Sequence, residues 1–355
     1  MATQRVRDRC REQIQTLSRS ATLTSDQESL QREAIACLQR VIGFDRWCWP
    51  MADPETLLPG IGAGEHDYGP ALPRALELEY SGTDYAAKDV IARSGTLAGS
   101  LDLETGGDLA RSPRWDEVLR PVGIGDVVAA ACHDASGCWG WIEAYRDAGD
   151  EPFSLHDIEL LAFAGQSLGT SLRRTVATSF AAVPAPPEPP GILVLDRDLR
   201  LVSQTAAAAR WLSVLPLAQV FAAWGMLPAP VYPAATLARA GRVARAHVLV
   251  PATDGRQVRI EAALLEGAPD GNIAVTLRAA AQSEVMDLAG RAHGLSPRER
   301  QVVALLTHGL DSRHMAKRLD ISTHTLQDHL KSVFGKLNVH SRRELLARLS
   351  GPGPG

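Results

Sequence analysis

Residues 295–349 read LSPRERQVVALLTHGLDSRHMAKRLDISTHTLQDHLKSVFGKLNVHSRRELLARL, a stretch in which helix starts and stops follow one another closely. The SPRE at its beginning has the spacing of a capping box, with proline at the first helical position. Gly309 stands where a glycine would end that helix, and Ser322 precedes a later apolar run as an N-cap. A second Ser-x-x-Glu box at residues 341–344 predicts a fourth helix. Four short helices, with a tight turn between the second and third, predict an all-α helix-turn-helix domain over residues 290–350.

This predicted domain is basic, although the chain as a whole is acidic. Residues 290–350 contain eleven Lys and Arg against five Asp and Glu, a surplus of six positive charges. Since the whole chain has a formal net charge of −4, the other residues together carry −10. A small basic module on a larger acidic body predicts binding to a polyanion, and we expect double-stranded DNA as the partner.

The third predicted helix has an apolar and a polar side. The residues expected on its buried side are Thr325, Leu326, His329, Leu330, Val333, Phe334 and Leu337. The width of the polar side fits a major groove about 12 Å across. Glutamine can bond adenine in two places, lysine suits guanine and aspartate can accept from cytosine. The residues expected to contact DNA are His324, Gln327, Asp328 and Lys331 on this helix, with Lys317, Arg318, Arg342 and Arg343 on phosphates.

The same stretch resembles the LuxR/FixJ-type DNA-binding domain over its full length. The matching motifs include the SPRE start, the run at residues 336–339 and the SRREL end. The resemblance implies a sequence-specific transcriptional regulator that acts as a homodimer, with RNA polymerase as a further candidate partner. It places Gln327, Asp328 and Lys331 at base-reading positions. The family more often has a basic residue where Gln327 stands, so we expect a weaker attraction to phosphates here.

A proline-rich run divides the rest of the chain. VPAPPEPPG has five prolines in nine residues and predicts a stiff linker over residues 181–191. The strands predicted upstream of it are residues 46–51, 125–133 and 138–146. A closing helix is expected after Ser154. The segments GCWGWIEAYR and FSLHDIELLAFAGQSL resemble the last strands and closing helix of a GAF domain, which implies a GAF-like α/β sensor domain over residues 1–180.

Short strands and turns alternate between the linker and the basic domain. A hairpin is predicted around residues 196–198, followed by a helix at residues 205–212. Asp254-Gly255, between two apolar runs, is the strongest hairpin signal in the chain. The pattern predicts a small antiparallel sheet with one or two helices, and it resembles a PAS domain over residues 192–281. We therefore expect an α+β multidomain protein.

Aromatic residues of the N-terminal part have two open interpretations. They are Trp47, Trp49, Tyr80, Tyr85, Trp139 and Trp141. The tryptophans of each pair lie two residues apart, so each pair is expected on one face of its strand. The six could line a pocket for a small-molecule ligand, the usual use of a GAF cavity. They could also form the core, and the strong tendency of tryptophan to be buried favours this second interpretation.

Other motifs of the N-terminal part do not form a recognisable metal or cofactor site. Cys132, His133 and Cys138 are too few and too poorly spaced for zinc, so no metal site is predicted. The glycine-rich run GIGAG at residues 60–64 lacks the strand-to-helix context of a nucleotide loop. The sequence identifies no cofactor. Because it also has no P-loop and no Gly-x-Ser-x-Gly elbow, we do not expect an enzyme.

Two other classes of regulator are weighed as alternatives. An autoinducer receptor ends in the same type of domain and has an aromatic and acidic pocket, which Trp47, Tyr80, Tyr85 and Asp84 loosely resemble. The middle domain and the GAF-like closing helix count against this class. A response regulator would need a phosphoacceptor aspartate on a doubly wound sheet with an acidic pair near its start, and nothing before Asp45 offers that.

Localisation and assembly can also be predicted. No apolar run reaches eighteen residues and the N-terminus has no signal-peptide pattern, so a cytoplasmic protein without membrane contact is expected. Two apolar stripes could hold a homodimer. They are Val6, Cys10, Ile14 and Leu17 near the N-terminus, and Leu345, Leu346 and Leu349 in the fourth predicted helix. The N-terminal stripe could instead pack on its own domain, which is slightly favoured, although the predicted dimer would be held mainly by that domain.

Overall fold

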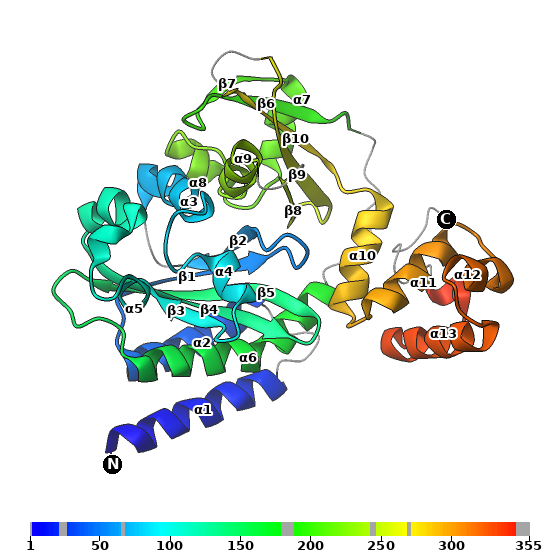
Figure 1. Cartoon of the computed structure of the whole chain (residues 1–355), viewed down its shortest axis with the longest axis horizontal. Coiled ribbons are helices and arrows are strands. Elements are labelled where there is room, and N and C mark those ends of the chain that lie inside the picture. The colour runs from blue at the N-terminus through cyan, green and yellow to red at the C-terminus, as the bar shows by residue number, and fades with distance from the viewer. Residues whose placement is uncertain are drawn as a thin grey trace.

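The computed structural model describes residues 2–20, 27–64, 68–178, 188–241, 246–267 and 271–345. It contains two five-stranded antiparallel sheets and a helical C-terminal region (Figure 1). The predicted mixture of helices and sheets is confirmed, including the helical C-terminal end. Within these ranges, no helix combines the length and apolar composition needed to span a bilayer.

The first sheet lies in the N-terminal part. Its strands are β1 (Arg46–Ala52), β2 (Pro59–Gly64), β3 (Ala98–Ser100), β4 (Ile124–Asp134) and β5 (Gly137–Asp147). They run antiparallel in the order β2-β1-β5-β4-β3. The three strands predicted from the sequence correspond to β1, β4 and β5. The pattern does not reveal β2 and β3, because β2 is rich in glycine and β3 has only three residues.

Helices cover both faces of the first sheet. On one face lie α2 (Gln27–Ile42) and α6 (Leu155–Thr178), and on the other lie α4 (Lys88–Arg93) and α5 (Leu101–Thr105) (Figure 1). Ser154 caps α6 as predicted, because its hydroxyl accepts a hydrogen bond from the Asp157 amide at 3.3 Å. The alternation of β4 sends Val128 to the α6 side and Val127 to the α4 side, so both faces have a packed core.

The N-terminal helix α1 (Ala2–Ser20) packs outside α2 and α6 (Figure 1). Cys10 and Ile14 are buried in this contact, and the Cys10 sulfur lies 2.6 Å from the sulfur of Cys37 on α2. The Ser171 hydroxyl of α6 donates to the Ser18 carbonyl at 3.0 Å. The two central residues of the predicted stripe are therefore covered by the chain's own helices rather than by its sheet, whereas Val6 stays exposed. The homodimer itself stays a prediction.

The two tryptophans of β5 lie on opposite faces of the sheet, contrary to the prediction. Relative to β4, strand β5 has one extra residue between Cys138 and Trp141. Such a β-bulge interrupts the alternation of side chains. Trp139 consequently packs in the cluster on the α6 side, whereas Trp141 packs on the α4 side. Trp47 and Trp49 of β1, where no bulge intervenes, share the α6 side as predicted.

The second sheet has the same internal order as the first. Its strands are β6 (Gly191–Leu195), β7 (Leu201–Gln204), β8 (Ala246–Pro251), β9 (Gln257–Leu264) and β10 (Ile273–Ala279). They run antiparallel in the order β7-β6-β10-β9-β8, and the predicted hairpin at Asp254-Gly255 joins β8 to β9. Three helices accompany this sheet, rather than one or two. They are α7 (Ala206–Ser213), capped by Thr205, α8 (Ala218–Ala223) and α9 (Val231–Arg239).

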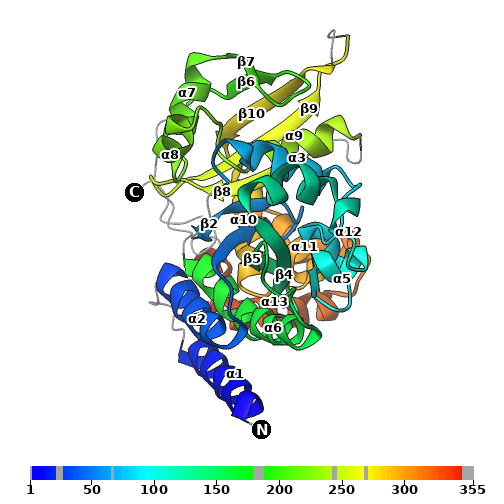
Figure 2. The same cartoon turned by 90° about the vertical axis from the view of Figure 1, so that its left-hand side faces the viewer.

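The two sheet-containing parts share a buried contact. Helix α3 (Leu72–Tyr80) belongs to the N-terminal part, yet Leu76 and Tyr80 pack into the cluster formed by the second sheet, α7 and α9 (Figure 2). The Asp53 carboxylate, after β1, accepts a hydrogen bond from the Leu249 amide of β8 at 2.9 Å. The linker predicted at residues 181–191 falls mostly outside the described residues.

Helix α10 (Gln282–Ala292) connects the second sheet to the C-terminal helices α11 (Pro297–Thr307), α12 (Ser312–Arg318) and α13 (Thr323–Leu337). It contacts all three parts of the chain. Glu284 pairs with Arg259 and Arg278 of the second sheet, both at 2.8 Å. The Ala292 carbonyl accepts from the guanidinium of Arg173 on α6 at 2.6 Å. Asp287 pairs with Arg300 of α11 at 3.4 Å.

Candidate nucleic-acid interface and internal cavity

The C-terminal helices begin and end at the predicted signals. Ser296 and Glu299 form a complete capping box, with the Ser296 amide donating to the Glu299 carboxylate at 2.6 Å. Gly309 follows α11 at φ +73°, the left-handed region that glycine favours. Ser322 caps α13 by accepting from the Thr325 amide at 3.0 Å. At the second predicted box, the Glu344 amide donates to the Ser341 hydroxyl at 3.1 Å, and helical residues follow up to the last described one.

Glu299 has a second role that the capping motif does not reveal. Its carboxylate also accepts from the Ser332 hydroxyl at 2.6 Å and from the Lys336 ammonium at 2.7 Å, both on α13. The residue is 4 % exposed. Although burial opposes the charge, the bonds from Lys336, Ser332 and the Ser296 amide lower the pKa of Glu299 to about 2. An ionised Glu299 therefore joins the start of α11 to the second half of α13.

Helix α13 presents the polar face expected from the sequence. His324, Gln327, Asp328 and Lys331 are all exposed, while the apolar positions Leu326, Leu330, Val333 and Leu337 are buried. Thr325 differs from the prediction, because its first-turn hydroxyl bonds the capping Ser322 and its side chain stays exposed. His329 is half-buried rather than fully packed. The Asp328 carboxylate lies 4.0 Å from the His324 ring one turn earlier.

The predicted phosphate contacts flank this face. Lys317, Arg318 and Arg343 are exposed. Arg342 is half-buried and donates to the Ser312 hydroxyl at 2.6 Å, so part of its guanidinium already fixes the start of α12. The fourth-helix dimer stripe is corrected at Leu345, which is fully buried in the core of the C-terminal helices. Leu346 and Leu349 lie outside the described residues.

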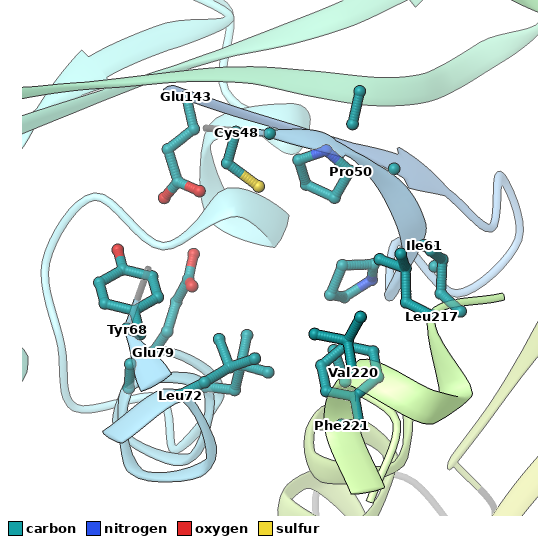
Figure 3. A pocket seen from close by; sticks show the side chains of 18 of the residues that line it. Cys48, Pro50, Ile61, Tyr68, Leu72, Glu79, Glu143, Leu217, Val220 and Phe221 are labelled. Carbon is teal, nitrogen blue, oxygen red and sulfur yellow. The ribbon is translucent and has the colours of Figure 1, made fainter. Parts of the chain in front are cut away.

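A cavity of about 180 Å³ lies between the first sheet and the helices α3 and α8 (Figure 3). Strand β2 forms one wall. Its GIGAG sequence lacks the context of a nucleotide loop, and it brings backbone rather than large side chains to the cavity. Gly62 has no room for a side chain, because a Cβ there would meet the Trp49 carbonyl of β1. The small residues of β2 thus allow this strand to pack closely on β1 and leave the space of the cavity unfilled.

One end of the cavity is charged. Lys88, the first residue of α4, donates to both oxygens of Glu79 at 2.9 and 2.8 Å and to Glu143 at 2.9 Å. Arg114 pairs with Glu79 at 3.3 Å and with Asp84 at 2.7 Å. The side chains of all five are almost completely buried. Despite desolvation, Lys88 and Arg114 lower the pKa of Glu143, and the carboxylates Glu143 and Glu79 raise the pKa of Lys88.

The six aromatic residues weighed as pocket residues lie elsewhere. Trp47, Trp49, Tyr80, Trp139 and Trp141 are at most 1 % exposed in the hydrophobic clusters, and Tyr85 is half-buried beneath the Arg111 guanidinium. Within the described residues, none of the six lines the cavity. The residues that do line it come mainly from β1, β2, β5, α3, α4 and α8, with Tyr68, Arg114 and Ala229 among those from other segments. No short motif links them in the sequence.

Comparison with known proteins identifies the C-terminal helices. Residues 293–349 match the model of the family described as bacterial regulatory proteins, luxR family. The chain is 41 % identical over 69 residues to the transcriptional regulatory protein FixJ of Bradyrhizobium diazoefficiens, a match that covers 19 % of this chain and 34 % of FixJ. It is 40 % identical over 50 residues to the nitrate/nitrite response regulator protein NarL of Escherichia coli, covering 14 % and 23 %. The C-terminal segment is therefore a helix-turn-helix domain of the luxR family.

These similarities do not extend through the rest of the chain. The chain spans only 34 % of the length of FixJ and 23 % of the length of NarL. A solved structure of VqmA from Vibrio cholerae covers 45 % of this chain and 81 % of its own, at 14 % identity and a TM-score of 0.21. So low a score supports no inference about the sheet-containing parts.

Proposed function

We propose that this protein is a sequence-specific DNA-binding transcriptional regulator whose sheet-containing body senses a chemical signal. The observation that carries the proposal is the luxR-family match at residues 293–349, combined with the exposed polar face of α13. We further propose a GAF-like domain at 1–180, a linker at 181–191, a PAS-like domain at 192–281 and the DNA-binding domain at 290–350. The shared strand order of the two sheets supports related folds for the two sensor domains.

Double-stranded DNA is the proposed partner, bound by two copies of the chain on an inverted repeat. A single helix-turn-helix reads one half-site, so useful affinity normally requires a dimer. A small-molecule ligand and RNA polymerase complete the proposed set of partners. The test is binding of the full chain to randomised duplex DNA followed by titration of the selected site with salt. We expect a log–log slope of about −3 to −6, one unit for roughly each neutralised phosphate. A salt-independent interaction, or none at micromolar protein, would overturn the proposal.

The exposed residues of α13 should separate by role. Lys331→Ala and Gln327→Ala should each weaken binding to the selected site by about 1–3 kcal/mol and relax its base preference, because both side chains reach towards base edges in this proposal. Arg343→Ala, the matched control, should weaken all sequences about equally, since a phosphate contact does not distinguish bases. The measurement is repeated site selection with each variant. An unchanged base preference for the first two variants would mean that α13 does not read the site.

A further inference from the structure

We propose that the cavity between β2, α3 and α8 binds a small neutral molecule with one ring and rejects charged molecules of the same shape. The ring of the ligand lies between the apolar side chains of α3 and those of the α8 region. Only the description of this ligand as the regulator's signal rests on the proposed function, since binding itself is a property of the cavity.

The charges at one end of the cavity already balance. Among the described residues, the charged side chains that line it are those of Glu79 and Glu143, which are negative, and those of Lys88 and Arg114, which are positive. Lys88 donates to both carboxylates, and Arg114 pairs with Glu79 at 3.3 Å. The second partner of Arg114, Asp84, does not line the cavity and also accepts from the Ser112 hydroxyl at 2.5 Å. Each lining charge therefore has its partner inside the protein.

Two further polar groups at this end are neutral. Burial raises the pKa values of the Tyr68 hydroxyl and the Cys48 thiol, and the nearby Glu143 carboxylate raises them further, so both groups keep their protons. A charged ligand would lose its water on entering and would meet only charges that are already paired among the described lining residues. Because burying an uncompensated ion is strongly unfavourable, the cavity selects a neutral ligand.

The rest of the lining is mainly apolar (Figure 3). Its large side chains are those of Ile61, Leu72, Phe221, Leu217, Val220 and Trp224. The last three are 51 %, 41 % and 38 % exposed, so they stand where the cavity opens to solvent. Exposed apolar side chains gathered at the rim of a cavity are typical of a surface that a ligand covers.

The volume and the aromatic lining favour a ligand with one ring. The cavity holds about 180 Å³, which compares with the roughly 150 Å³ of an engineered cavity that binds benzene. One six-membered ring with a short arm therefore fits. Phe221 and Trp224 already form an edge-to-face pair, with 6.2 Å between the ring centroids. An aromatic ring in the cavity adds a further contact of this kind.

A ligand in this position contacts two parts of the chain at once. Leu72 belongs to α3 of the N-terminal part, whereas Val220 and Phe221 belong to α8 beside the second sheet. Binding therefore stabilises the arrangement in which α8 lies against α3 and β2. A regulator that senses such a ligand would do so through the relative position of its two sheet-containing parts.

The test uses the full chain and two pairs of probes that differ in charge but little in shape. Neutral 2-phenylacetamide is compared with anionic phenylacetate, and neutral 2-phenylethanol is compared with cationic 2-phenylethylamine. Ligand-observed NMR titration gives Kd for each probe. We expect the neutral probes to bind with a Kd of about 1 mM or tighter. Each charged probe should bind at least about ten-fold more weakly than its neutral counterpart.

Substitutions in the lining locate the binding. Leu72→Phe fills part of the cavity and should weaken the binding of both neutral probes by at least about five-fold. Leu103→Phe, at an exposed position of α5, is the matched control and should leave binding unchanged. Trp224→Ala removes an aromatic contact at the mouth and should weaken binding by about three- to ten-fold. Because Trp224 is partly exposed, this second variant should fold even if Leu72→Phe does not.

Several results would overturn the proposal: no binding of either neutral probe, neutral probes that bind no better than their charged counterparts, or unchanged binding in the folded lining variants. The comparison of the probes on the unmodified chain decides the matter even if a variant fails to fold. DNA binding is measured separately without any probe. Absence of DNA binding with retained probe binding would reject the regulator and leave the cavity proposal standing, and the reverse result would reject only the cavity.

Discussion

Lys88→Met is expected to lower the free energy of unfolding by about 3–5 kcal/mol, because it leaves Glu79 and Glu143 buried without their shared cation. The substitution keeps most of the side-chain length, so the loss reports charge rather than volume. The measurement is urea denaturation followed by circular dichroism. Arg93→Met is the matched control on the same helix, since Arg93 pairs with Asp89 through a largely exposed side chain. That control should cost less than about 1 kcal/mol.

A double substitution sharpens this prediction. Lys88→Met combined with Glu143→Gln removes one cation and one carboxylate together, so it should be more stable than Lys88→Met alone. Residues of one ion-pair network typically show such non-additivity. If Lys88→Met costs no more than Arg93→Met, or if the two substitutions at the cluster add independently, the buried charges are not coupled as the distances indicate.

Glu299→Gln should destabilise the C-terminal domain by about 2–3 kcal/mol at pH 7. The pKa of Glu299 is about 2 in the folded chain, against an ordinary value of 4.5. Its contribution is therefore complete above about pH 4.5 and is lost as the pH falls towards 2. The difference between the variant and the unmodified chain should shrink to less than half by about pH 3. This stability difference is measured by thermal denaturation at several pH values. The exchange of α13 amide hydrogens reports on the C-terminal domain in particular.

The second capping box provides the control for this prediction. Glu344→Gln changes an exposed carboxylate that bonds the His340 amide at 2.7 Å but has no described partner on another helix. It should cost only about 0.5–1 kcal/mol, as a capping contact does. Equal losses in the two variants would show that Glu299 acts as a cap alone and that its bonds to α13 add nothing.

The features that were predictable from the sequence are local ones. Ser296, Gly309 and Ser322 act within one or two turns, so their spacing locates the helix ends without knowledge of the fold. Trp139 shows where such reasoning stops, because the bulge that redirects it depends on the pairing of β5 with β4. Thr325 is a second example within a single helix. Its side chain stays exposed because its hydroxyl bonds that of the capping Ser322, which the apolar pattern of the helix does not reveal.

The cavity could not be predicted because its parts come together only in three dimensions. Glu79 and Glu143 are far apart in the chain and meet through Lys88. One signal was nevertheless present: Lys88 is the only lysine outside residues 290–350, in a chain that otherwise uses arginine there. A glycine-rich run such as GIGAG occurs in many kinds of structure. That it forms a wall of the cavity follows only from the pairing of β2 with β1.

Because α10 contacts the second sheet, α6 and α11, a tilt of this helix would change how these parts are positioned relative to one another. Its eleven residues span about 16 Å at 1.5 Å per residue. Near one end Glu284 pairs with Arg259 of the second sheet, and at the other end the Ala292 carbonyl accepts a hydrogen bond from Arg173. A tilt of about 10° around Glu284 would move the C-terminal end of the helix by roughly 3 Å. In the proposed dimer the two displacements would add, and they would act on half-sites whose centres lie one helical turn of DNA, about 34 Å, apart. For such a change in the spacing of the two proposed DNA-binding domains, the hydrogen bond from Arg173 to the Ala292 carbonyl would have to break.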